Sequence, residues 1–500
     1  MDPIPSMFGV CSGVGMAAAA AVVVVFVFAW RFYNFIWLKP KKMETFLRDQ
    51  GLKGTSYKLL YGDVKEMVKM ITEAYRTPIN LNDDILPRVL SFAHSVVTTY
   101  GKNCFTWMGP RPILHISDPT LIKEIFGNYE DFQKQRGGNP LTSLLAKGLV
   151  DVEGDQWVKH RKIINPAFHI EKLKLMVPAF YVSCEEMINK WEEALNENGS
   201  CEIDVWPHLQ TLAADVISRT AFSSSYVEGR KIFELQREQA ELVIAASQSI
   251  YIPGSRFLPT KSNKRMKEIA REVLVKGIID KRVAEIKEGG NSNDDLLGIL
   301  LDSNYKEIKQ HGNNKFGLSI DDVIEECQHI SWQDRARDEI SKVFGDRKPD
   351  IEGLNQLKII NIIFLEVLRL YTPVVGMPRM VHKETKLGNI TLPAGTLMQV
   401  HTMLLHYDPS IWGDDVKEFK PERFSQGVSK VTKGQTAFIP FGGGPRVCIG
   451  QNFAMLEAKM SLVMILSRFS FELSPSYSHA PYTIITLQPQ FGAHLILHKL

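Results

Sequence analysis

A cysteine near the end of the chain lies in a glycine-rich loop whose residue types suit a bound metal cofactor. The loop, residues 441–450, reads Phe-Gly-Gly-Gly-Pro-Arg-Val-Cys-Ile-Gly, with Arg446 two residues before Cys448. Apolar residues recur with a helical period over 451–469, which predicts a buried helix directly after the loop. The dipole and the unpaired N–H groups of a helix N-terminus favour a thiolate over a thiol at Cys448.

The other residues of the loop indicate what this thiolate would bind. Gly442–Gly444 and Gly450 would let the backbone approach a large, flat group, and Arg446 could pair with an acidic substituent on it. A thiolate held against a flat acidic group is the arrangement of a haem with a cysteine axial ligand. The alternative is a buried cysteine in a glycine turn, because free cysteines are among the most buried residues.

Two further pairs have the spacing of residues on one helix face. Trp157 and Arg161 are four residues apart, so an indole N–H and a guanidinium could donate to one carboxylate. The alternative for this pair is a Trp–Arg stack on the surface. Glu366 and Arg369 are three residues apart in the apolar helical stretch 354–370, where they could form an ordinary ion pair.

Composition gives few restrictions on function. The net charge of +3 indicates neither a nucleic-acid partner nor an acidic one. Six scattered cysteines without metal-ligand spacing favour a reducing compartment over a disulfide scaffold. A chain of 500 residues is long enough for two to four domains, but no long low-complexity linker divides it, so one large unit is the alternative.

The N-terminal stretch predicts a membrane anchor. Residues 7–30 contain no charged side chain and can span a bilayer core of about 30 Å. Asp2 is the only charge before this stretch, whereas four basic residues follow within 31–42, and this asymmetry places the bulk of the chain in the cytosol. We therefore expect a lumenal terminus at 1–6, a single-pass anchor, typically of the endoplasmic reticulum, and a linker with N-terminal helices over 31–100. A buried core helix is the alternative.

The loop at 441–450 resembles the haem-binding signature of the cytochrome P450 family, F-x-x-G-x-R-x-C-x-G, at every fixed position. The similarity runs from about Gly101 to the C-terminus, and the segment after the anchor looks like the plant clan that contains secologanin synthase. The resemblance implies a mainly α fold with small β-sheets and a haem-thiolate catalytic domain over 101–500. It implies haem b as the cofactor, with Cys448 as the axial ligand of the iron. The cofactor-binding residues that it implies in this loop are Phe441, Arg446, Cys448 and Gly450.

The resemblance also implies roles for residues elsewhere in the chain. Trp157 with Arg161 resembles the family's W-x-x-x-R element, which contacts a haem propionate, and Arg379 matches a second propionate partner. Glu366 with Arg369 resembles the E-x-x-R element. The segment Pro421–Phe424 resembles the P-E-R-F box, whose arginine joins that pair in a structural network that braces the cysteine loop. The arginine of this box is Arg423.

One element of the family is missing from its expected place. A long helix, starting in a segment like Ile320–Cys327, should cross the haem face opposite the thiolate and carry A-G-x-[D/E]-T, whose acid and hydroxyl help to deliver protons to bound oxygen. Here 325–331 runs directly into 332–337, which resembles the helix that follows. Roughly thirty residues, or about 45 Å of helix, are therefore absent near 328–332. Lys383–Thr385 offers an acid and a threonine outside any helix, so we identify no catalytic residue.

The resemblance implies a monooxygenase that hydroxylates an apolar small molecule, such as a terpenoid-like skeleton or a growth regulator. It would use O2 and electrons from NADPH through a membrane-bound NADPH–cytochrome reductase. The missing helix leaves two alternatives open: a haem-thiolate protein that cannot activate oxygen, and a truncated splice or gene-model product that binds haem weakly or not at all. A non-enzymatic membrane scaffold would need none of the matched residues.

Overall fold

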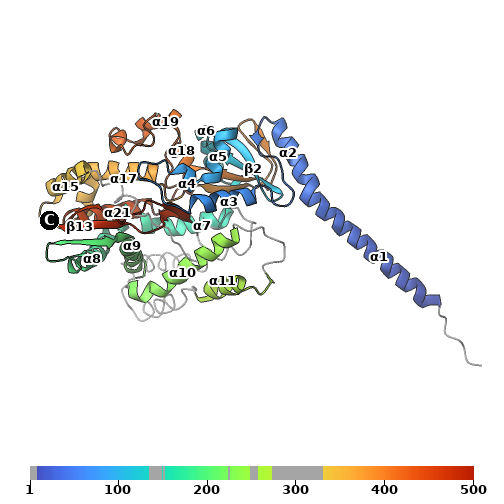
Figure 1. Ribbon diagram of the computed structural model, residues 1–500, viewed down its shortest axis with the longest axis horizontal. Helices are drawn as coiled ribbons and strands as arrows, with labels where there is room; N and C mark the ends of the chain where they lie inside the picture. The colour runs from blue at the N-terminus through green and yellow to red at the C-terminus, as the bar shows by residue number, and fades with distance from the viewer. Residues whose placement is uncertain (1–7, 135–148, 150–151, 223–225, 248–256, 273–329) are drawn as a thin grey trace, which may run out of the picture.

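The computed structural model describes the chain except for residues 1–7, 135–148, 150–151, 223–225, 248–256 and 273–329. The described residues form a mainly α-helical fold with small β-sheets, which confirms the predicted fold class. One long N-terminal helix projects from a body of sheets and helices (Figure 1). The predicted deletion near 328–332 lies partly outside the described residues, and the segment that follows it is helical, as predicted, in α15 (Ile330–Phe344).

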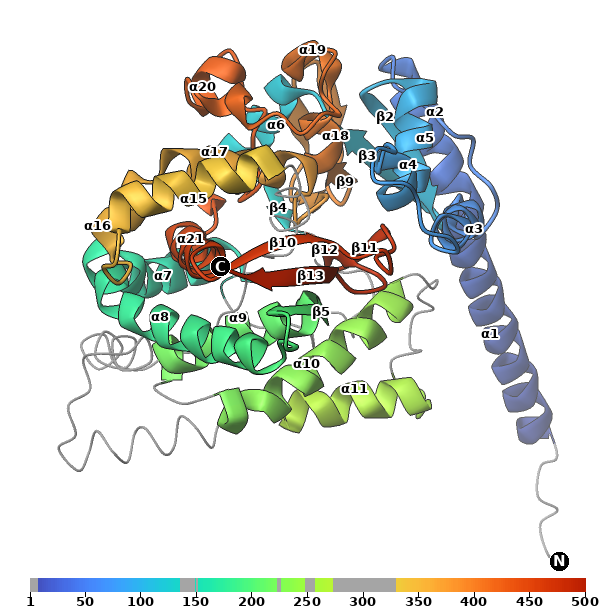
Figure 2. The ribbon, with the colours of Figure 1, turned by 60° about the vertical axis from the view of Figure 1, so that its left-hand side comes forward.

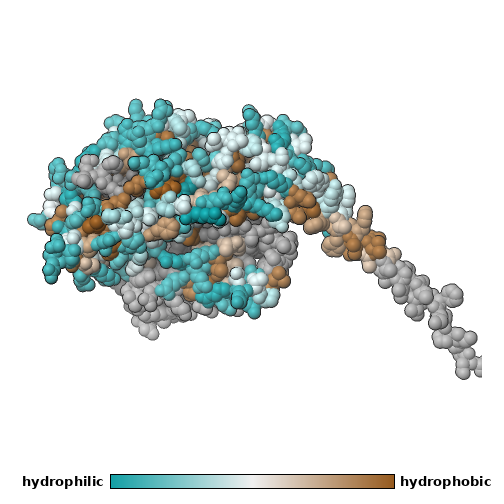
Figure 3. Space-filling view, in the orientation of Figure 1, coloured by the Kyte–Doolittle hydropathy of each residue, from teal (hydrophilic) through white to brown (hydrophobic). Residues whose placement is uncertain are grey.

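Helix α1 (Phe8–Tyr33) is long and apolar enough to cross a membrane, the one such helix found among the described residues. Its side chains from Ala19 to Tyr33 are all exposed, and Phe26 keeps 70% of its surface accessible. Figure 3 shows hydrophobic residues along the described part of this projecting helix. An apolar helix whose described side chains are exposed suits a lipid environment, in agreement with the predicted anchor at 7–30.

The anchor continues without a break into the body through a π-helical turn, Asn34–Leu38, and then α2 (Lys39–Asp49). Pro40 has no N–H and cannot donate to the carbonyl of Ile36, four residues earlier. The hydroxyl of Tyr57 donates to that carbonyl at 2.5 Å instead. A side chain of the body therefore binds a backbone carbonyl of the π-helical turn below the anchor, and this bond joins the two parts.

A six-stranded sheet lies next to the anchor. Strands β2 (Asn103–Met108) and β3 (Arg111–Ile116) pair in antiparallel register around a turn at Gly109, with Cys104 opposite His115. Four successive residues of β2, Cys104–Trp107, are buried, which is the pattern of a strand covered on both faces. The order is β1 (Lys53–Gly54), β2 (Asn103–Met108), β3 (Arg111–Ile116), β9 (Leu397–Val400), β6 (Met377–Val381) and β4 (Phe132–Lys134).

The helical part of the body is built around α21 (Gln451–Leu466), which begins just after the cysteine loop. Figure 2 shows α21 between α17 (Lys358–Leu370) and α8 (Ile170–Glu193). Apart from the half-buried Met455, every residue of α21 from Phe453 onward is buried, because helices surround it. The predicted helix over 451–469 is therefore correct at its start and three residues too long at its end, since β10 (Phe469–Leu473) begins there.

Helix α17 depends on α15 for its first turn. Its N-cap residue, Leu357, has no side-chain acceptor, but Glu339 of α15 accepts hydrogen bonds from the N–H groups of the first three residues, 358–360. A carboxylate at a helix N-terminus is also favoured by the helix dipole. The start of α17, and with it the position of Glu366 and Arg369, is thus determined by packing between two helices.

The remaining elements surround these two parts. A three-stranded sheet has the order β10-β13-β5, and two hairpins, β7-β8 and β11-β12, complete the strands. Their bounds, and those of the other described helices, are α3 (Val64–Ala74), α4 (Leu86–Val89), α5 (Ser91–Tyr100), α6 (Pro119–Gly127), α7 (Gly154–Ile164), η3 (Asn165–Phe168), β5 (Ser200–Asp204), α9 (Val205–Phe222), α10 (Tyr226–Ser247), α11 (Lys261–Glu272), α16 (Ile351–Gln356), β7 (Thr385–Leu387), β8 (Ile390–Leu392), α18 (Thr402–His406), α19 (Pro409–Trp412), η5 (Pro421–Phe424), α20 (Val428–Val431), η6 (Gly444–Arg446), β11 (Pro481–Ile484), β12 (Thr486–Pro489) and β13 (His494–Lys499).

Removing the Tyr57 hydroxyl should loosen the joint between the anchor and the body. We expect Tyr57→Phe to lower the free energy of unfolding by about 1 kcal/mol, because the Ile36 carbonyl loses this hydrogen-bond donor. Distances between spin labels on the anchor and on the body, measured in lipid nanodiscs, should spread over a wider range. Tyr61→Phe is the matched control because Tyr61 is exposed, and an identical distribution for Tyr57→Phe and wild type would refute this role.

Candidate functional site

The loop that carries Cys448 is closed by its own backbone hydrogen bonds. The N–H of Cys448 donates to the carbonyl of Phe441 at 2.9 Å, and the N–H of Val447 donates to that of Gly444 at 3.1 Å. Gly450 is the N-cap residue of α21, so Cys448 lies two residues before the cap, as the sequence suggested. Gly444 and Pro445 are exposed, whereas Cys448 is half-buried, so the loop reaches the surface while it partly encloses the sulfur.

Burial raises the pKa of the Cys448 thiol above its ordinary value. A hydrogen bond with the backbone of Gly450 and the charge of Arg161 lower this pKa, but they do not outweigh the burial. Burial at Cys448 therefore outweighs the effects that we expected to favour a thiolate there. A bound cation at the sulfur would supply the missing stabilisation, because metal binding deprotonates a cysteine ligand.

Two of the loop glycines are required by a neighbouring helix. A Cβ on Gly443 would lie 2.6 Å from a ring carbon of Phe126, and one on Gly444 would lie 2.3 Å from the Phe126 carbonyl oxygen. Gly444 also has a φ of +63°, which side chains rarely adopt. The described contacts of Gly443 and Gly444 are thus with the end of α6, and their approach to a flat group stays a prediction.

Helix α7 holds the loop through the two residues that share its face. The ring of Trp157 lies under the guanidinium of Arg446, 4.2 Å from ring centroid to Cζ. Arg161 donates to the carbonyl of Val447 at 2.8 Å. The structure therefore brings Trp157, Arg161 and Arg446 together beside Cys448, and Trp157 is buried, unlike the exposed Trp–Arg stack that was the alternative.

Arg379, on β6, is a buried cation with few partners. Its side chain makes one hydrogen bond within the described residues, from Nη1 to the carbonyl of Pro378 at 2.9 Å, and its Cζ lies 5.7 Å from the ring centroid of Phe126. Burial lowers the pKa of Arg379 to about 10. A buried guanidinium with one hydrogen bond among the described residues fits the acidic group of a cofactor, since a bound anion would offset its desolvation.

Sequence reasoning missed an acidic residue at the site. Glu153, directly before α7, is buried and forms an ion pair with Arg446, whose Nη1 also donates to the carbonyl of Val152 at 3.0 Å. The other carboxylate oxygen of Glu153 accepts from the N–H of Lys134 at 3.0 Å. The acidic partner of Arg446 in this structure is therefore a residue of the chain itself.

Glu366 and Arg369 form a fully buried ion pair, with both side chains 0% exposed. Two nitrogens of Arg369 donate to the two oxygens of Glu366, at 2.8 and 2.7 Å. Glu366 also accepts from the N–H of Lys420 at 3.0 Å and contacts Arg423 at 3.4 Å. Arg423 binds Asp415, whose pKa falls to about 2 because Lys420 and Arg423 donate hydrogen bonds to it. The structure thus brings the three predicted network residues together.

A buried histidine connects this network to the cysteine loop. Arg369 donates to the carbonyl of His406 at 3.1 Å, and the Nε2 of His406 accepts from the N–H of Ile439 at 3.0 Å. The carbonyl of Ile439 in turn accepts from the N–H of Gly442 at 3.0 Å. Burial, followed by the charge of Arg369, lowers the pKa of His406 to about 3, so its ring is neutral and can accept this bond. A lone histidine in an apolar segment gave no signal of this role in the sequence.

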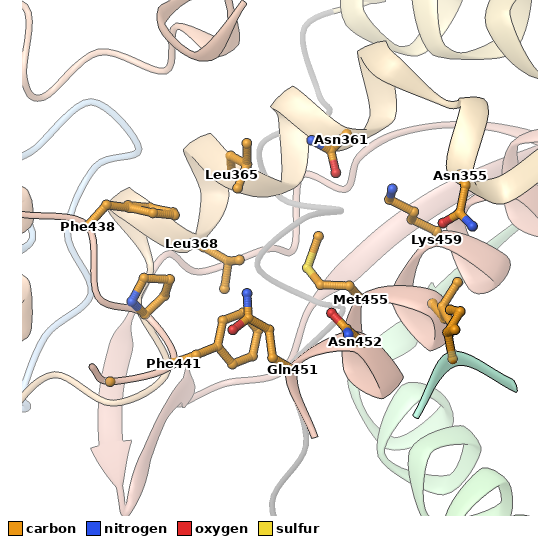
Figure 4. A pocket seen from close by; sticks show the side chains of 14 residues that line it. Asn355, Asn361, Leu365, Leu368, Phe438, Phe441, Gln451, Asn452, Met455 and Lys459 are labelled. Carbon is orange, nitrogen blue, oxygen red and sulfur yellow. The ribbon is translucent and has the colours of Figure 1, made fainter. Parts of the chain in front are cut away.

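A cavity of about 400 Å³ lies between α17 and α21, next to the loop. Asn361 and Leu365 of α17 face Asn452 and Met455 of α21 across it, and Phe441 lines the side nearest the loop (Figure 4). Phe441 thus connects the lining of this cavity to the loop that holds Cys448.

Comparisons with known proteins identify relatives over nearly the whole chain. A family model described as Cytochrome P450 matches residues 87–332 and 327–490. The chain is 58% identical over 497 residues to "Cytochrome P450 CYP72A219" of Panax ginseng, with 94% of this chain and 96% of the relative covered. It is 50% identical over 500 residues to "7-deoxyloganic acid hydroxylase" of Catharanthus roseus, with the same shares covered.

The buried ion pair should matter far more to stability than an exposed one. We expect Arg369→Ala to cost about 3–5 kcal/mol of unfolding free energy, because Glu366 would remain buried without its partner. Arg335→Ala, which removes an exposed pair with Glu422, is the control and should cost at most about 1 kcal/mol. Denaturant unfolding followed by circular dichroism measures both, and equal losses would contradict the proposed bracing.

The neutral His406 should make the fold sensitive to acid. The unfolded chain protonates His406 near its ordinary pKa of 6.5, whereas the folded chain does so only near about 3. The unfolded state therefore binds more protons in this window, and stability falls as the pH is lowered through it, by up to about 1.4 kcal/mol per unit for one group. Urea midpoints between pH 6.5 and pH 4.5 should fall more steeply for wild type than for His406→Phe, and parallel curves would rule out this contribution.

Proposed function

Because this chain belongs to the cytochrome P450 family of monooxygenases, we propose that it hydroxylates a terpenoid-like small molecule. The support for this substrate class is the 50% identity to a relative named 7-deoxyloganic acid hydroxylase, over almost the full length of both chains. A growth regulator with an apolar skeleton is the alternative substrate, since it is also an apolar small molecule. O2 is the co-substrate, and a reductase passes the electrons of NADPH to the enzyme.

The residues around the loop would hold the haem as follows. Cys448 would be the axial ligand of the iron, and the cofactor's acidic edge would face Arg379, with Trp157 and Arg161 beside it. The observation that carries this assignment is the buried Arg379 guanidinium, which makes one hydrogen bond within the described residues and feels the charge of Arg446, two residues before the half-buried Cys448. The haem supplies the oxygen chemistry when bound, and the chain supplies its position and electrostatic surroundings.

The anchor and the exposed part of the loop support a membrane-bound enzyme that receives electrons from outside. Helix α1 would span the membrane of the endoplasmic reticulum, with 1–6 in the lumen and the catalytic domain, 101–500, in the cytosol. Gly444 and Pro445 are exposed four and three residues before Cys448, so a membrane-bound NADPH–cytochrome reductase could approach the cysteine side. We propose no nucleic-acid partner.

A second candidate is a chain that binds haem but activates oxygen poorly, because it lacks most of the family's long central helix. The family model matches in two segments that overlap at 327–332, the place of the proposed deletion. The alignment with the Panax ginseng relative is 497 residues long, but it includes only 94% of this 500-residue chain. The difference consists of residues of the relative that have no counterpart here. The A-G-x-[D/E]-T pattern occurs nowhere in the sequence. A splice or gene-model product would have this form.

The carbon monoxide difference spectrum of the reduced chain in membranes tests the haem site. We expect a thiolate-type band from the wild-type chain and none from Cys448→Ala, because the ligand sulfur is removed. NADPH-dependent turnover with added reductase then separates the two candidates: hydroxylated product supports the monooxygenase, and a band without product supports the impaired chain. A thiolate-type band from Cys448→Ala would refute the ligand assignment.

Restoring the helix tests the account of the deletion. Insertion of a family-like helix of about thirty residues after Gln328 should raise haem occupancy and turnover, because it would wall the pocket opposite the thiolate. A Gly-Ser insertion of equal length is the control, since it adds chain without a rigid helix. Haem occupancy that stays unchanged with the helical insertion would show that the deletion does not limit this chain.

A further inference from the structure

We propose that the cavity between α17 and α21 binds a small carboxylate with an apolar body, and that the acidic group of this ligand pairs with Lys459. Each helix contributes one face to the cavity. Asn452, Met455 and Lys459 follow one another at i, i+3 and i+7 along α21, which places them on one side of the helix. Asn361 and Leu365 are four residues apart on the facing side of α17.

Lys459 is a buried cation with little compensation among the described residues. It is 8% exposed, and its ammonium makes one hydrogen bond there, to the carbonyl of Leu354 at 3.5 Å, which is long for such a bond. Burial lowers the pKa of Lys459, and the charge of Glu339 opposes this shift without forming an ion pair with it in the described part of the chain. An ammonium has three donors, so a bound anion would both accept from it and offset its desolvation.

The charges around the cavity select the class of ligand. Lys459 is the only charged side chain among the described residues that line it. One cation matches one negative charge, whereas a doubly charged phosphate would be buried with an uncompensated charge. The half-buried amide of Asn361 lines the same cavity and can donate to the second oxygen of a carboxylate. A monocarboxylate therefore fits better than a phosphate.

The rest of the lining fits an apolar body of limited size. Leu365, Met455 and Phe441 line the part of the cavity nearest the cysteine loop (Figure 4). The volume of about 400 Å³ lies within the range of small-molecule sites, roughly 300–1,000 Å³. Asn355 and Asn452 also line the cavity and are exposed, so a ligand can enter from solvent.

The cavity adjoins the proposed haem site without using the residues assigned to the iron or to the cofactor's acidic edge. Neither Cys448 nor Arg379 is among its described lining residues. Phe441 connects the two places, because it lines the cavity while its carbonyl accepts from the N–H of Cys448 at 2.9 Å. A ligand in the cavity would therefore touch the cysteine loop, but its binding does not require bound haem.

Hydrocinnamate and its primary amide test this inference, because the two molecules have the same phenyl body and differ in charge. Equilibrium dialysis with the full-length chain in lipid nanodiscs, corrected with empty nanodiscs, gives both dissociation constants. At pH 7 we expect the carboxylate to bind roughly tenfold more tightly, since it alone forms a charge-assisted hydrogen bond with Lys459. Hydrogen exchange followed by mass spectrometry should slow in 355–361 and 451–459, which locates the ligand in this cavity.

Lys459→Met should remove the preference for the carboxylate and bring the two dissociation constants within about twofold of each other. Methionine keeps the apolar stem of the side chain and removes only one long hydrogen bond, so the variant is expected to fold. Lys358→Met is the matched control, because it removes an equal charge from an exposed position on α17. It should leave the preference within about twofold of wild type, since exposed charges are screened.

A second variant keeps the test decisive if Lys459→Met does not fold. Asn361→Leu replaces a half-buried amide and leaves Lys459 in place, and we expect it to weaken carboxylate binding by roughly fivefold. Equal affinities of wild type for the two probes, an unchanged preference in Lys459→Met, or slowed exchange only in other segments would overturn the inference. A chain that binds hydrocinnamate in this cavity but shows no haem spectrum would support the inference and overturn the proposed function.

Discussion

The fully buried ion pair of Glu366 and Arg369 is the interaction on which the arrangement of the site depends. Two charges at 0% exposure are tolerated because nearly every donor and acceptor of the pair has a partner, including the carbonyls of His406 and Val416. The partners come from segments more than thirty residues away along the chain. Satisfying one buried pair therefore requires α17, the end of α18 and the segment before η5 to meet at one point.

That point is connected to the cysteine loop by a short series of hydrogen bonds. His406 accepts from Ile439, and Ile439 accepts from Gly442 at the start of the loop. From the other side, α6 packs against Gly443 and Gly444, and α7 holds Arg446 and Val447. Cys448 is thus placed by contacts on both sides of its loop. A metal bound at this sulfur would have to deprotonate it.

The two buried arginine side chains near the loop, Arg446 and Arg379, differ in their charge partners. Arg446 pairs with Glu153, whereas the Arg379 side chain makes one hydrogen bond within the described part of the chain and has a pKa lowered to about 10. A buried cation without an anion is costly, and the cost falls when an anionic ligand binds. Glu153 therefore bridges β4 to Arg446 of the cysteine loop.

The sequence by itself determined the features that depend on local pattern. Residue type and spacing were sufficient for the apolar anchor of α1, the start of α21 after the cysteine loop, and the helical pairs 157/161 and 366/369. The family motifs also placed Arg423 with Glu366 and Arg369, because a fixed motif order reports a recurring spatial arrangement. The end of α21 was predicted three residues too late, since the helix stops where a strand begins to pair with β13.

Only the tertiary structure decided which groups meet across the chain, because burial and charge pairing depend on residues that are distant in sequence. The thiol pKa of Cys448 is raised, against the local expectation, since burial by the surrounding fold outweighs the helix N-terminus. Glu153 and His406 carry no recognisable spacing, yet one neutralises Arg446 and the other ties the buried ion pair to the loop. Gly443 and Gly444 are required by Phe126, more than three hundred residues earlier in the chain, which no local pattern can reveal.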